Sequence, residues 1–398
     1  MLGRLTELAA IDRQPDGACR RLALTDPDRR GRDLVVRWMR EAGLDPVTDA
    51  IGNIVAVRPG LEPGAPILTG SHIDTVSTGG ELDGAYGVIA GLEALCRMQE
   101  TGGRTRRALG LAVFTNEEGV RFQPDMMGSL VFAGALHLEE ALDARSSDGA
   151  RLGDELVRIG YAGAAPPGVP RPHAFVELHI EQGPVLDAAG EVLGVVEGVQ
   201  GISWRRVTIL GVSNHAGTTP MSLRHDAGYC AGAVVSFVRA LSLELGAGQV
   251  ATVGSLSFEP NLINVVPRRA TLTVDLRNAD DAVLTRAEHR LAEFLAELAV
   301  AEGVEIVVEP LVRTRPVRFS GEIVGRIEAI AAKLGWPIRR MISGAGHDAQ
   351  MLAPIAPTAM IFVPSVGGVS HNPREATDPD HLEMGANLLL QTLLDLAS

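Results

Sequence analysis

The sequence predicts an α/β protein of two domains: a mixed sheet with helices on both faces, and a smaller domain inserted into the first. Three observations predict this class. A chain of 398 residues is longer than one ordinary domain, and 46% hydrophobic residues can bury a sizeable core. Short apolar runs alternate with segments of helical spacing along the first half of the chain. The order of these segments then changes near residue 204.

The first and last parts of the chain alternate strands and helices. Their predicted elements are helix 33–42, strand 54–57, strand 65–71, helix 86–98, strand 109–114, strand 174–178, helix 321–334, strand 358–363 and helix 381–396. Alternation of this kind is typical of an α/β/α layout, in which helices cover both faces of the sheet. Residues 1–203 and 315–398 are therefore predicted to form one domain.

The segment 204–314 follows a different order. Its predicted elements are strand 205–210, helix 227–245, strand 250–258, strand 271–276, helix 282–301 and strand 304–308. The order β-α-β-β-α-β is that of the ferredoxin-like split unit, which is a compact two-layer domain in its own right. We therefore predict that 204–314 is an inserted domain.

Composition excludes several classes of function. Thirty-six basic against forty-nine acidic residues give a formal charge of −13, which repels a phosphate backbone, so nucleic-acid binding is not expected. The cysteines Cys19, Cys96 and Cys230 are few, widely spaced and odd in number, which favours a reducing compartment. No apolar signal core follows Met1, and no uninterrupted apolar stretch reaches about 18 residues. We expect a soluble cytoplasmic protein that does not bind a membrane.

Imidazole and carboxylate side chains follow the predicted strands of the first domain. The residues concerned are His72, Asp74, Asp83, Glu117, Glu118 and His371. Open α/β sheets place ligands in the crevice beyond the carboxyl ends of their strands. Clustered His, Asp and Glu residues are ligand types for hard-to-borderline metals. The sequence therefore predicts a metal-dependent hydrolase.

Seven motifs extend this set over nearly the whole chain. They are Gly70-Ser71-His72-Ile73-Asp74-Thr75-Val76, Asp83-Gly84-Ala85-Tyr86-Gly87, Asn116-Glu117-Glu118-Gly119-Val120-Arg121-Phe122, Glu177-Leu178-His179-Ile180-Glu181-Gln182-Gly183-Pro184, Asn214-His215-Ala216-Gly217-Thr218-Thr219-Pro220-Met221, Gly344-Ala345-Gly346-His347-Asp348-Ala349 and Ser370-His371-Asn372. In this order the chain resembles the M20-type metallohydrolases, specifically the amidase branch of N-carbamoyl-L-amino-acid hydrolases, β-ureidopropionases and allantoate amidohydrolases. His179 separates this branch from relatives that have a carboxylate at the same place.

The resemblance implies a site for two divalent cations in each subunit. The residues that would hold one cation are His72, Asp83 and His179, and those that would hold the other are Asp83, Glu118 and His371. Asp83 would bridge the two. Zinc suits such ligands, and manganese, cobalt or nickel could also occupy the site. Asp74 would orient the imidazole of His72 through its other ring nitrogen.

The resemblance also implies roles in catalysis and substrate binding. Glu117 would be the general acid/base that carries a proton from the attacking water to the leaving nitrogen. His215 would reach the site of a neighbouring subunit and polarise the scissile carbonyl. The substrate-binding residues would be Gln182, His215, Asn264, Arg277 and His347. The fork of Arg277 matches a carboxylate, and the inserted domain would act as a lid and build a homodimer.

The expected reaction is cleavage of the ureido C–N bond of an N-carbamoyl-L-amino acid to the amino acid, ammonia and carbon dioxide. Allantoate and β-ureidopropionate are alternative substrates, and an M20-type dipeptidase is a further alternative, because all would place an acyl carbon above the same metals. The remaining alternative is a catalytically silent binding protein. Loss of the base or of a ligand would mark it, but Glu117 and all five ligand candidates are present. The residues of the segment 122–132 do not match the pattern of any one of these substrates, so they do not select among them.

Overall fold

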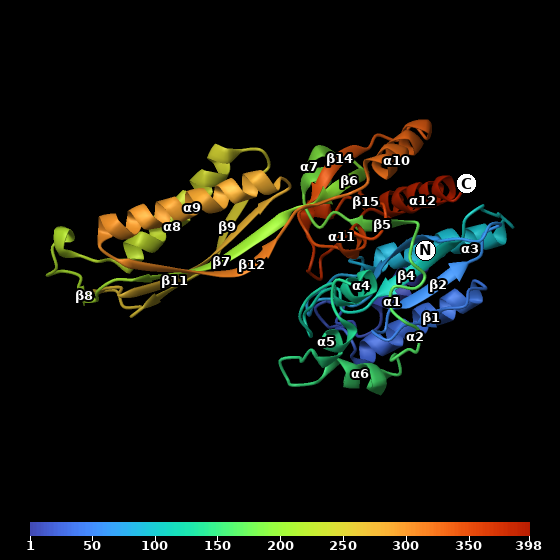
Figure 1. Ribbon diagram of the computed structural model, residues 1–398, viewed down its shortest axis with the longest axis horizontal. Coiled ribbons are helices and arrows are strands. Elements are labelled where there is room, and N and C mark those ends of the chain that lie inside the picture. Colours follow the sequence, from blue (N-terminus) through green and yellow to red (C-terminus); the bar gives the residue numbers. More distant parts are fainter. The chain divides into compact units, whose positions relative to one another are not determined.

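A computed structural model describes all 398 residues as two compact units (Figure 1). The main unit contains Met1–Gly198 and Arg318–Ser398, and the inserted unit contains Val199–Val317. The sequence analysis places the boundaries of the inserted unit a few residues further in, at 204 and 314. The inserted unit starts earlier because its first strand begins at Gly201, ahead of the predicted residue 205.

The main unit contains most of the helices and strands of the chain. In order they are α1 (Leu2–Ala9), α2 (Asp26–Glu41), β1 (Val47–Thr48), β2 (Ile54–Arg58), β3 (Ile67–His72), α3 (Ala85–Glu100), β4 (Leu109–Phe114), α4 (Met127–Ala133), α5 (Leu138–Asp143), α6 (Leu152–Ile159), β5 (Ala174–Ile180), α7 (Val185–Ala189), β6 (Gly194–Val199), β13 (Val317–Arg318), α10 (Gly321–Lys333), β14 (Arg339–Ser343), α11 (Asp348–Leu352), β15 (Thr358–Val363) and α12 (Pro379–Leu396).

A nine-stranded mixed sheet forms the centre of the main unit. Its order is β1-β2-β4-β3-β5-β15-β6-β13, with β14 beside β6. The four central strands β4, β3, β5 and β15 run parallel, whereas β2 and β6 flank them in the antiparallel sense. Every residue of the four parallel strands is buried, as in sheets covered on both faces. Their carboxyl ends therefore meet at one edge.

Helices cover both faces of this sheet. Leu111 of β4 approaches Gly91 of α3 on one face, and α12 packs beside α3. Phe114, three positions along the same strand, points to the other face and contacts Phe132 of α4 edge-on, with ring centroids 5.7 Å apart. Helix α11 packs against α4 on that second face. The predicted α/β class is confirmed.

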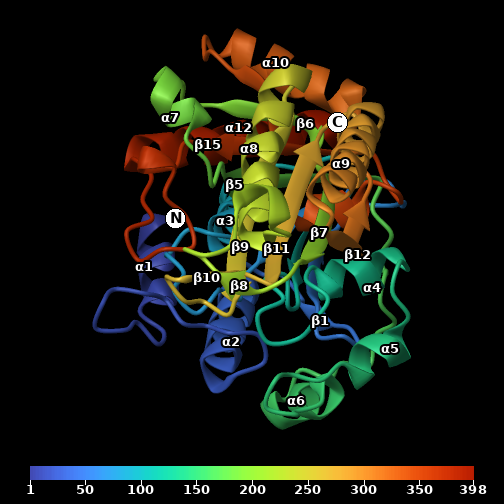
Figure 2. The same cartoon turned by 90° about the vertical axis from the view of Figure 1, so that its left-hand side faces the viewer.

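The inserted unit is a four-stranded antiparallel sheet with two helices. Its elements are β7 (Gly201–Leu210), β8 (Asn214–His215), α8 (Ala227–Leu245), β9 (Val250–Glu259), β10 (Val265–Val266), β11 (Arg269–Asn278), α9 (Asp281–Glu302) and β12 (Glu305–Thr314). The sheet order is β12-β7-β11-β9, and Figure 2 shows α8 and α9 side by side over these strands. This is the predicted β-α-β-β-α-β arrangement. The pair β8 and β10 forms a separate two-stranded ribbon.

Helix α8 is the one helix long and apolar enough, by length and composition, to cross a membrane. One of its faces is buried in the inserted unit, where Val234 and Val238 join Val207 and Leu272 of the sheet in one apolar core. The helix thus serves as the cover of a small two-layer domain. Of its most apolar 18 residues, 28% are buried.

Some elements differ from the sequence-based prediction. Helix α2 begins at Asp26 instead of residue 33, because Thr25 caps it by accepting a hydrogen bond from the backbone N of Asp28. Strand β12 continues to Thr314 instead of ending at 308, because it stays paired with β7 beyond a register shift after Pro310. The elements that were not predicted are mostly short: α1, β1, α4, α5, α6, α7, β6, β8, β10, β13, β14 and α11.

Candidate metal centre

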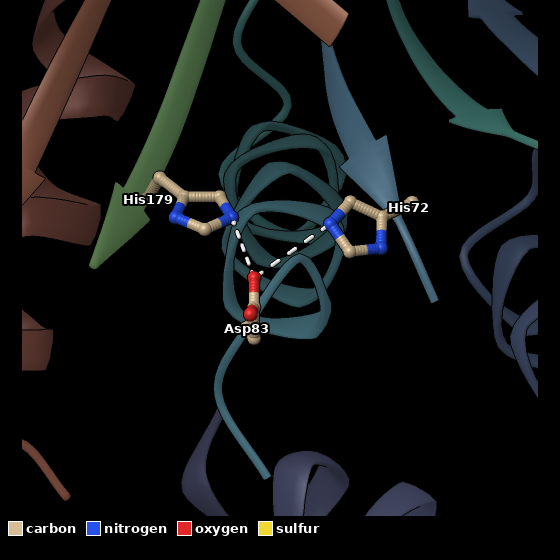
Figure 3. A group of neighbouring side chains, drawn as sticks. All are labelled: His72, Asp83 and His179. Atoms are coloured by element: carbon tan, nitrogen blue, oxygen red, sulfur yellow. Dashed lines mark ion pairs between the residues drawn. The ribbon is translucent and has the colours of Figure 1, made fainter. Parts of the chain in front are cut away.

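Two imidazoles point at one oxygen of Asp83 (Figure 3). His72 is the last residue of β3, and its Nε2 lies 3.7 Å from Oδ1 of Asp83. His179 lies near the end of β5, and its Nε2 is 3.2 Å from the same oxygen. The ligand atoms of these three residues are close enough together to hold one metal ion. All three side chains are buried.

A second group forms around the other oxygen of Asp83. Nε2 of His371 lies 3.1 Å from Oδ2 of Asp83 and 3.4 Å from Oε2 of Glu118. These three residues could also hold a metal ion. The two groups share Asp83 and use one of its oxygens each, which is the geometry of a carboxylate that bridges two cations.

The turn that carries Asp83 is held by close packing. Gly84 has a φ of 64°, and a Cβ at this position would collide with the ring of His72. Oε1 of Glu375 accepts hydrogen bonds from the backbone N of Leu82 and of Asp83, at 3.0 and 3.1 Å. Its Oε2 accepts one from Ser370, next to His371. Glu375 therefore connects the Asp83 turn to the His371 loop, a role that the sequence did not reveal.

Asp74 supports both sides of the site. Its backbone oxygen lies 3.0 Å from Nδ1 of His72, whereas its carboxylate is 3.9 Å from that nitrogen. The carboxylate instead accepts hydrogen bonds from the backbone N of Glu117 and of Glu118, at 3.2 Å each. The backbone of Asp74 thus orients the imidazole, and its side chain fixes the turn that carries both glutamates.

Glu117 faces the metal groups from this turn. Its side chain is almost buried, and Oε2 lies 3.4 Å from Nε2 of His72. It lines a cavity of about 130 Å³ together with Asp83, Glu118 and His371. A carboxylate placed here, beside the ligands but outside both groups, can exchange a proton with a molecule in the cavity.

The charges of the site favour cations. Burial, together with the nearby charges of other carboxylates, raises the pKa of Glu117 and of Glu118 well above the usual value. Burial alone would also raise the pKa of Asp83, but hydrogen bonds from His179 and His371 hold it well below the usual range. Burial lowers the pKa of His72 to about 4, which favours the neutral imidazole that a metal requires. Against the effect of burial, the hydrogen bond to Asp83 instead raises the pKa of His179 to about 9. Carboxylates and imidazoles without a thiolate are a ligand set that fits zinc and related divalent ions.

His347 and Glu177 lie on the β5 side of the site. The ring of His347 is 4.6 Å from that of His179, and its Nε2 is 3.0 Å from Oγ of Ser343. The carboxylate of Glu177 accepts hydrogen bonds from Oγ of Ser71 and from the backbone N of Ala349, at 2.6 and 2.8 Å. Glu177 therefore ties β5 to β3 and α11. It belongs to a motif, but sequence reasoning gave it no role.

Gln182 lies within the second metal group. Its Nε2 donates a hydrogen bond of 2.8 Å to Oδ2 of Asp83 and lies 3.3 Å from Nε2 of His371. The backbone N of Gln182 donates to Oγ of Ser365 at 3.0 Å, which fixes its position. The side chain thus borders the same cavity as Glu117.

His215 and Asn264 lie together in the inserted unit. They stand on or beside the paired strands β8 and β10, and the backbone N of Ala216 donates to the oxygen of Asn264 at 2.9 Å. Nδ1 of His215 accepts hydrogen bonds from the backbone N of Gly217 and of Thr218, at 3.1 and 3.2 Å. A neutral ring with these partners carries its proton on Nε2, which is then available to donate.

Arg277 lies at the other end of the same sheet. It pairs with Ile202 near the start of β7, whereas Leu210, which precedes His215, is at the opposite end of that strand. Eight residues of strand separate these two ends, or about 26 Å at about 3.3 Å per residue. Arg277 contacts the carboxylate of Asp275 at 2.8 Å and lies over the ring of Trp204. The inserted unit therefore does not bring Arg277 together with His215.

Two buried arginines, Arg21 and Arg32, donate hydrogen bonds to segments next to the metal centre. Arg32 forms an ion pair of 2.8 Å with Asp28, and both side chains are fully buried. Its other nitrogens donate to the oxygen of Gly52 and to Oγ1 of Thr115, close to Glu117. Arg21 donates to the oxygen of Ile73, next to His72, at 2.7 Å. Nothing in the local sequence distinguishes these arginines from surface ones.

A model of the family described as peptidase family M20/M25/M40 matches residues 68–395, a range that contains every residue of the metal centre. The chain belongs to this M20 family. The family membership predicted from the seven motifs is confirmed.

Members of the M20 family with known names resemble this chain over its full length. An N-carbamoyl-L-amino-acid amidohydrolase of Rhizobium meliloti is 40% identical over 99% of this chain and 95% of its own. An allantoate amidohydrolase of Bacillus subtilis is 35% identical over 98% of this chain and 95% of its own. The crystal structure of a hydantoinase/carbamoylase family amidase from Burkholderia multivorans is 44% identical, with a TM-score of 0.97 over 100% of this chain and 97% of that one.

Proposed function

We propose that the protein is a metal-dependent amidohydrolase that cleaves the ureido C–N bond of N-carbamoyl-L-amino acids to the amino acid, ammonia and carbon dioxide. The observation that carries this proposal is the position of Asp83, whose two oxygens join two ligand groups beside Glu117. The resemblance to N-carbamoyl-L-amino-acid amidohydrolases over the full chain supports the choice of bond.

The residues of the main unit divide the chemistry between them. Two divalent cations held by His72, Asp83, His179, Glu118 and His371 would polarise the substrate carbonyl and lower the pKa of water. Zinc is the metal that we propose first, with manganese, cobalt or nickel as substitutes. Glu117 takes a proton from the attacking water and delivers it to the nitrogen of the C–N bond that breaks. Gln182 and His347 contact the substrate from the walls of the cavity.

The inserted unit supplies the remaining substrate contacts in a homodimer. A small ureido acid cannot span the roughly 26 Å of strand between Arg277 and His215. We therefore assign Arg277 to the site of its own subunit, where its fork binds the substrate carboxylate. His215 and Asn264 serve the site of the partner subunit, where Nε2 of His215 donates to the scissile carbonyl. The proposed compartment is the cytoplasm.

Allantoate hydrolysis is the second candidate. The allantoate amidohydrolase of Bacillus subtilis is 35% identical over 98% of this chain, and allantoate also carries ureido groups beside a carboxylate. The same metal centre would serve both substrates, so the two candidates differ only in the contacts to the rest of the molecule.

A substrate panel tests the proposed function. Zinc-loaded protein would be supplied with N-carbamoyl-L-amino acids, allantoate, β-ureidopropionate and dipeptides, with Glu117→Gln as the inactive control. We expect the highest kcat/KM, measured from ammonia release, with N-carbamoyl-L-amino acids. A higher value for allantoate would select the second candidate. No turnover of any substrate would indicate a binding protein instead.

Mixing two inactive variants tests the homodimer. His215→Ala leaves a complete metal centre, whereas Glu117→Gln leaves a complete inserted unit. In a mixed dimer one site would combine both intact parts, so random exchange of subunits should restore about a quarter of the wild-type activity. If mixing restores nothing although mixed dimers form, His215 acts in its own subunit.

A further inference from the structure

A short loop connects the catalytic glutamate to one wall of the cavity. The segment 119–126 leaves the metal centre after Glu118 and returns to it, because the backbone N of Met126 donates a hydrogen bond of 2.7 Å to the oxygen of Glu117. Within the loop, Nε2 of Gln123 donates to the oxygen of Gly119 at 2.6 Å. The loop is therefore closed on itself and fixed to the turn that carries the general acid/base.

Asp125 is pressed against this turn. Gly119 has a φ of 62°, and a Cβ at this position would lie 2.8 Å from both Cα and Cβ of Asp125. Only glycine lets the loop pack so closely behind Glu118. The position of Asp125 relative to the metal ligands is thus set by the backbone.

The carboxylate of Asp125 differs from the other carboxylates around the site. Asp74, Glu177 and Glu375 each accept hydrogen bonds from two or more groups of the protein, which explains their positions. Asp125 lines the cavity beside Glu117, is exposed, and accepts no hydrogen bond from any other residue. A carboxylate that has no hydrogen-bond partner in another residue therefore lines the cavity.

Asp125 lines a small cavity. Its volume is about 130 Å³. Met126 closes one side, because its Sδ and Cε lie 3.4 and 3.1 Å from the position that a Cβ on Gly346 would take. Asp125 and Met126 therefore border the same small space as Glu117, where the group to be cleaved would lie.

We propose that Asp125 is a specificity-determining residue that accepts hydrogen bonds from the terminal NH₂ of the ureido group. This inference rests on the proposed function and adds the group that separates ureido from N-acyl substrates. An N-acetyl substrate places a methyl group where the NH₂ would lie, and a methyl group cannot donate. Sites built to bind a donor discriminate strongly against an analogue that lacks it.

A matched pair of substrates tests the role of Asp125. N-carbamoyl-L-alanine and N-acetyl-L-alanine differ only in NH₂ against CH₃, so their ratio of kcat/KM reports this contact. Asp125→Ala should lower kcat/KM for the carbamoyl substrate by about 10- to 100-fold, the worth of a hydrogen bond to a charged group. Turnover of the acetyl substrate should stay the same or rise. Asp125→Asn keeps one acceptor oxygen, so its kcat/KM for the carbamoyl substrate should lie between the values of the wild-type protein and of Asp125→Ala.

Controls separate this role from a structural one. Glu139→Ala removes an exposed acidic side chain on α5 that does not line the cavity, and it should leave the substrate ratio unchanged. Metal content and melting temperature would be measured for every variant. An equal loss on both substrates, or no loss on either, would overturn the inference about Asp125 alone. A wild-type protein that hydrolyses neither substrate would overturn the proposed function, and this inference with it.

Discussion

Glu117→Gln separates proton transfer from metal binding. Glutamine has the shape of glutamate, so the substitution leaves no void at a residue that is only 8% exposed. The turn keeps its support, because the carboxylate of Asp74 binds the backbone of Glu117 and not its side chain. Glu118, the proposed metal ligand, stays in place on the same turn. The variant therefore removes a proton acceptor and changes little else.

The expected loss follows from the task of the carboxylate. General acid/base catalysis contributes about 10²- to 10⁴-fold, so the barrier to kcat should rise by about 2.7 to 5.5 kcal/mol. The fold should not be weakened. Burial, then the negative charges of Asp348 and Glu118, raise the pKa of Glu117, which means that the ionised group is costly where it stands. A neutral amide avoids this cost, so the melting temperature should stay or rise.

Two measurements on the same protein decide the outcome. Ammonia release gives kcat, and elemental analysis gives the number of metal ions per subunit. We expect two ions and a large loss of turnover. Glu118→Gln is the matched control on the neighbouring position, and it should lose an ion because it alters a ligand. Normal turnover with a lost ion in Glu117→Gln would show that the two glutamates have exchanged roles.

Three further predictions concern the metals, the substrate carboxylate and the scaffold. Chelation should abolish activity, and zinc, manganese, cobalt or nickel should restore it; full activity in protein shown by elemental analysis to be metal-free would refute the two-metal site. Arg277→Lys should lower kcat/KM almost as much as Arg277→Ala, and the loss should correspond to about 2 to 5 kcal/mol in the activation free energy. The loss should be much smaller for an amide analogue of the substrate. Equal losses on both substrates would mean that Arg277 supports the inserted unit, through contacts such as those with Asp275 and Trp204, and does not bind the carboxylate. Arg32→Met leaves Asp28 buried without its cation and should cost about 3 to 5 kcal/mol in urea unfolding, whereas the double variant Arg32→Met/Asp28→Leu should recover most of that loss. No loss in the single variant would refute the buried pair.

The central strands and the residues at their ends could be predicted from the sequence. The runs that form β4 and β15 are wholly apolar or nearly so. The first charged residue after β4 is Glu117. The first after β15 is Arg374, and His371 lies between the end of β15 and Arg374. Parallel strands bring such ends to one edge, so position in the sequence was enough to predict that metal-type residues gather there. The division into two ligand groups came from the family resemblance.

Contacts between distant segments could not be predicted. Glu375 binds the backbone of Asp83 across 292 residues, and an acidic residue in a loop carries no local sign of such a partner. The same holds for the separation of Arg277 from His215, since element order does not give strand register. The short helices α4 to α6 were missed because they consist of only six to eight residues each.

The shared position of Asp83 has a consequence for the life of the protein in the cell. Its two oxygens gather groups that the chain supplies from His72 to His371, so cations bound there link segments from most of the main unit. A metal that binds only the folded chain adds RT ln(1 + [metal]/Kd) to the free energy of unfolding. Scarcity of the metal then lowers resistance to proteases as well as turnover, and the abundance of the protein follows the supply of its cation.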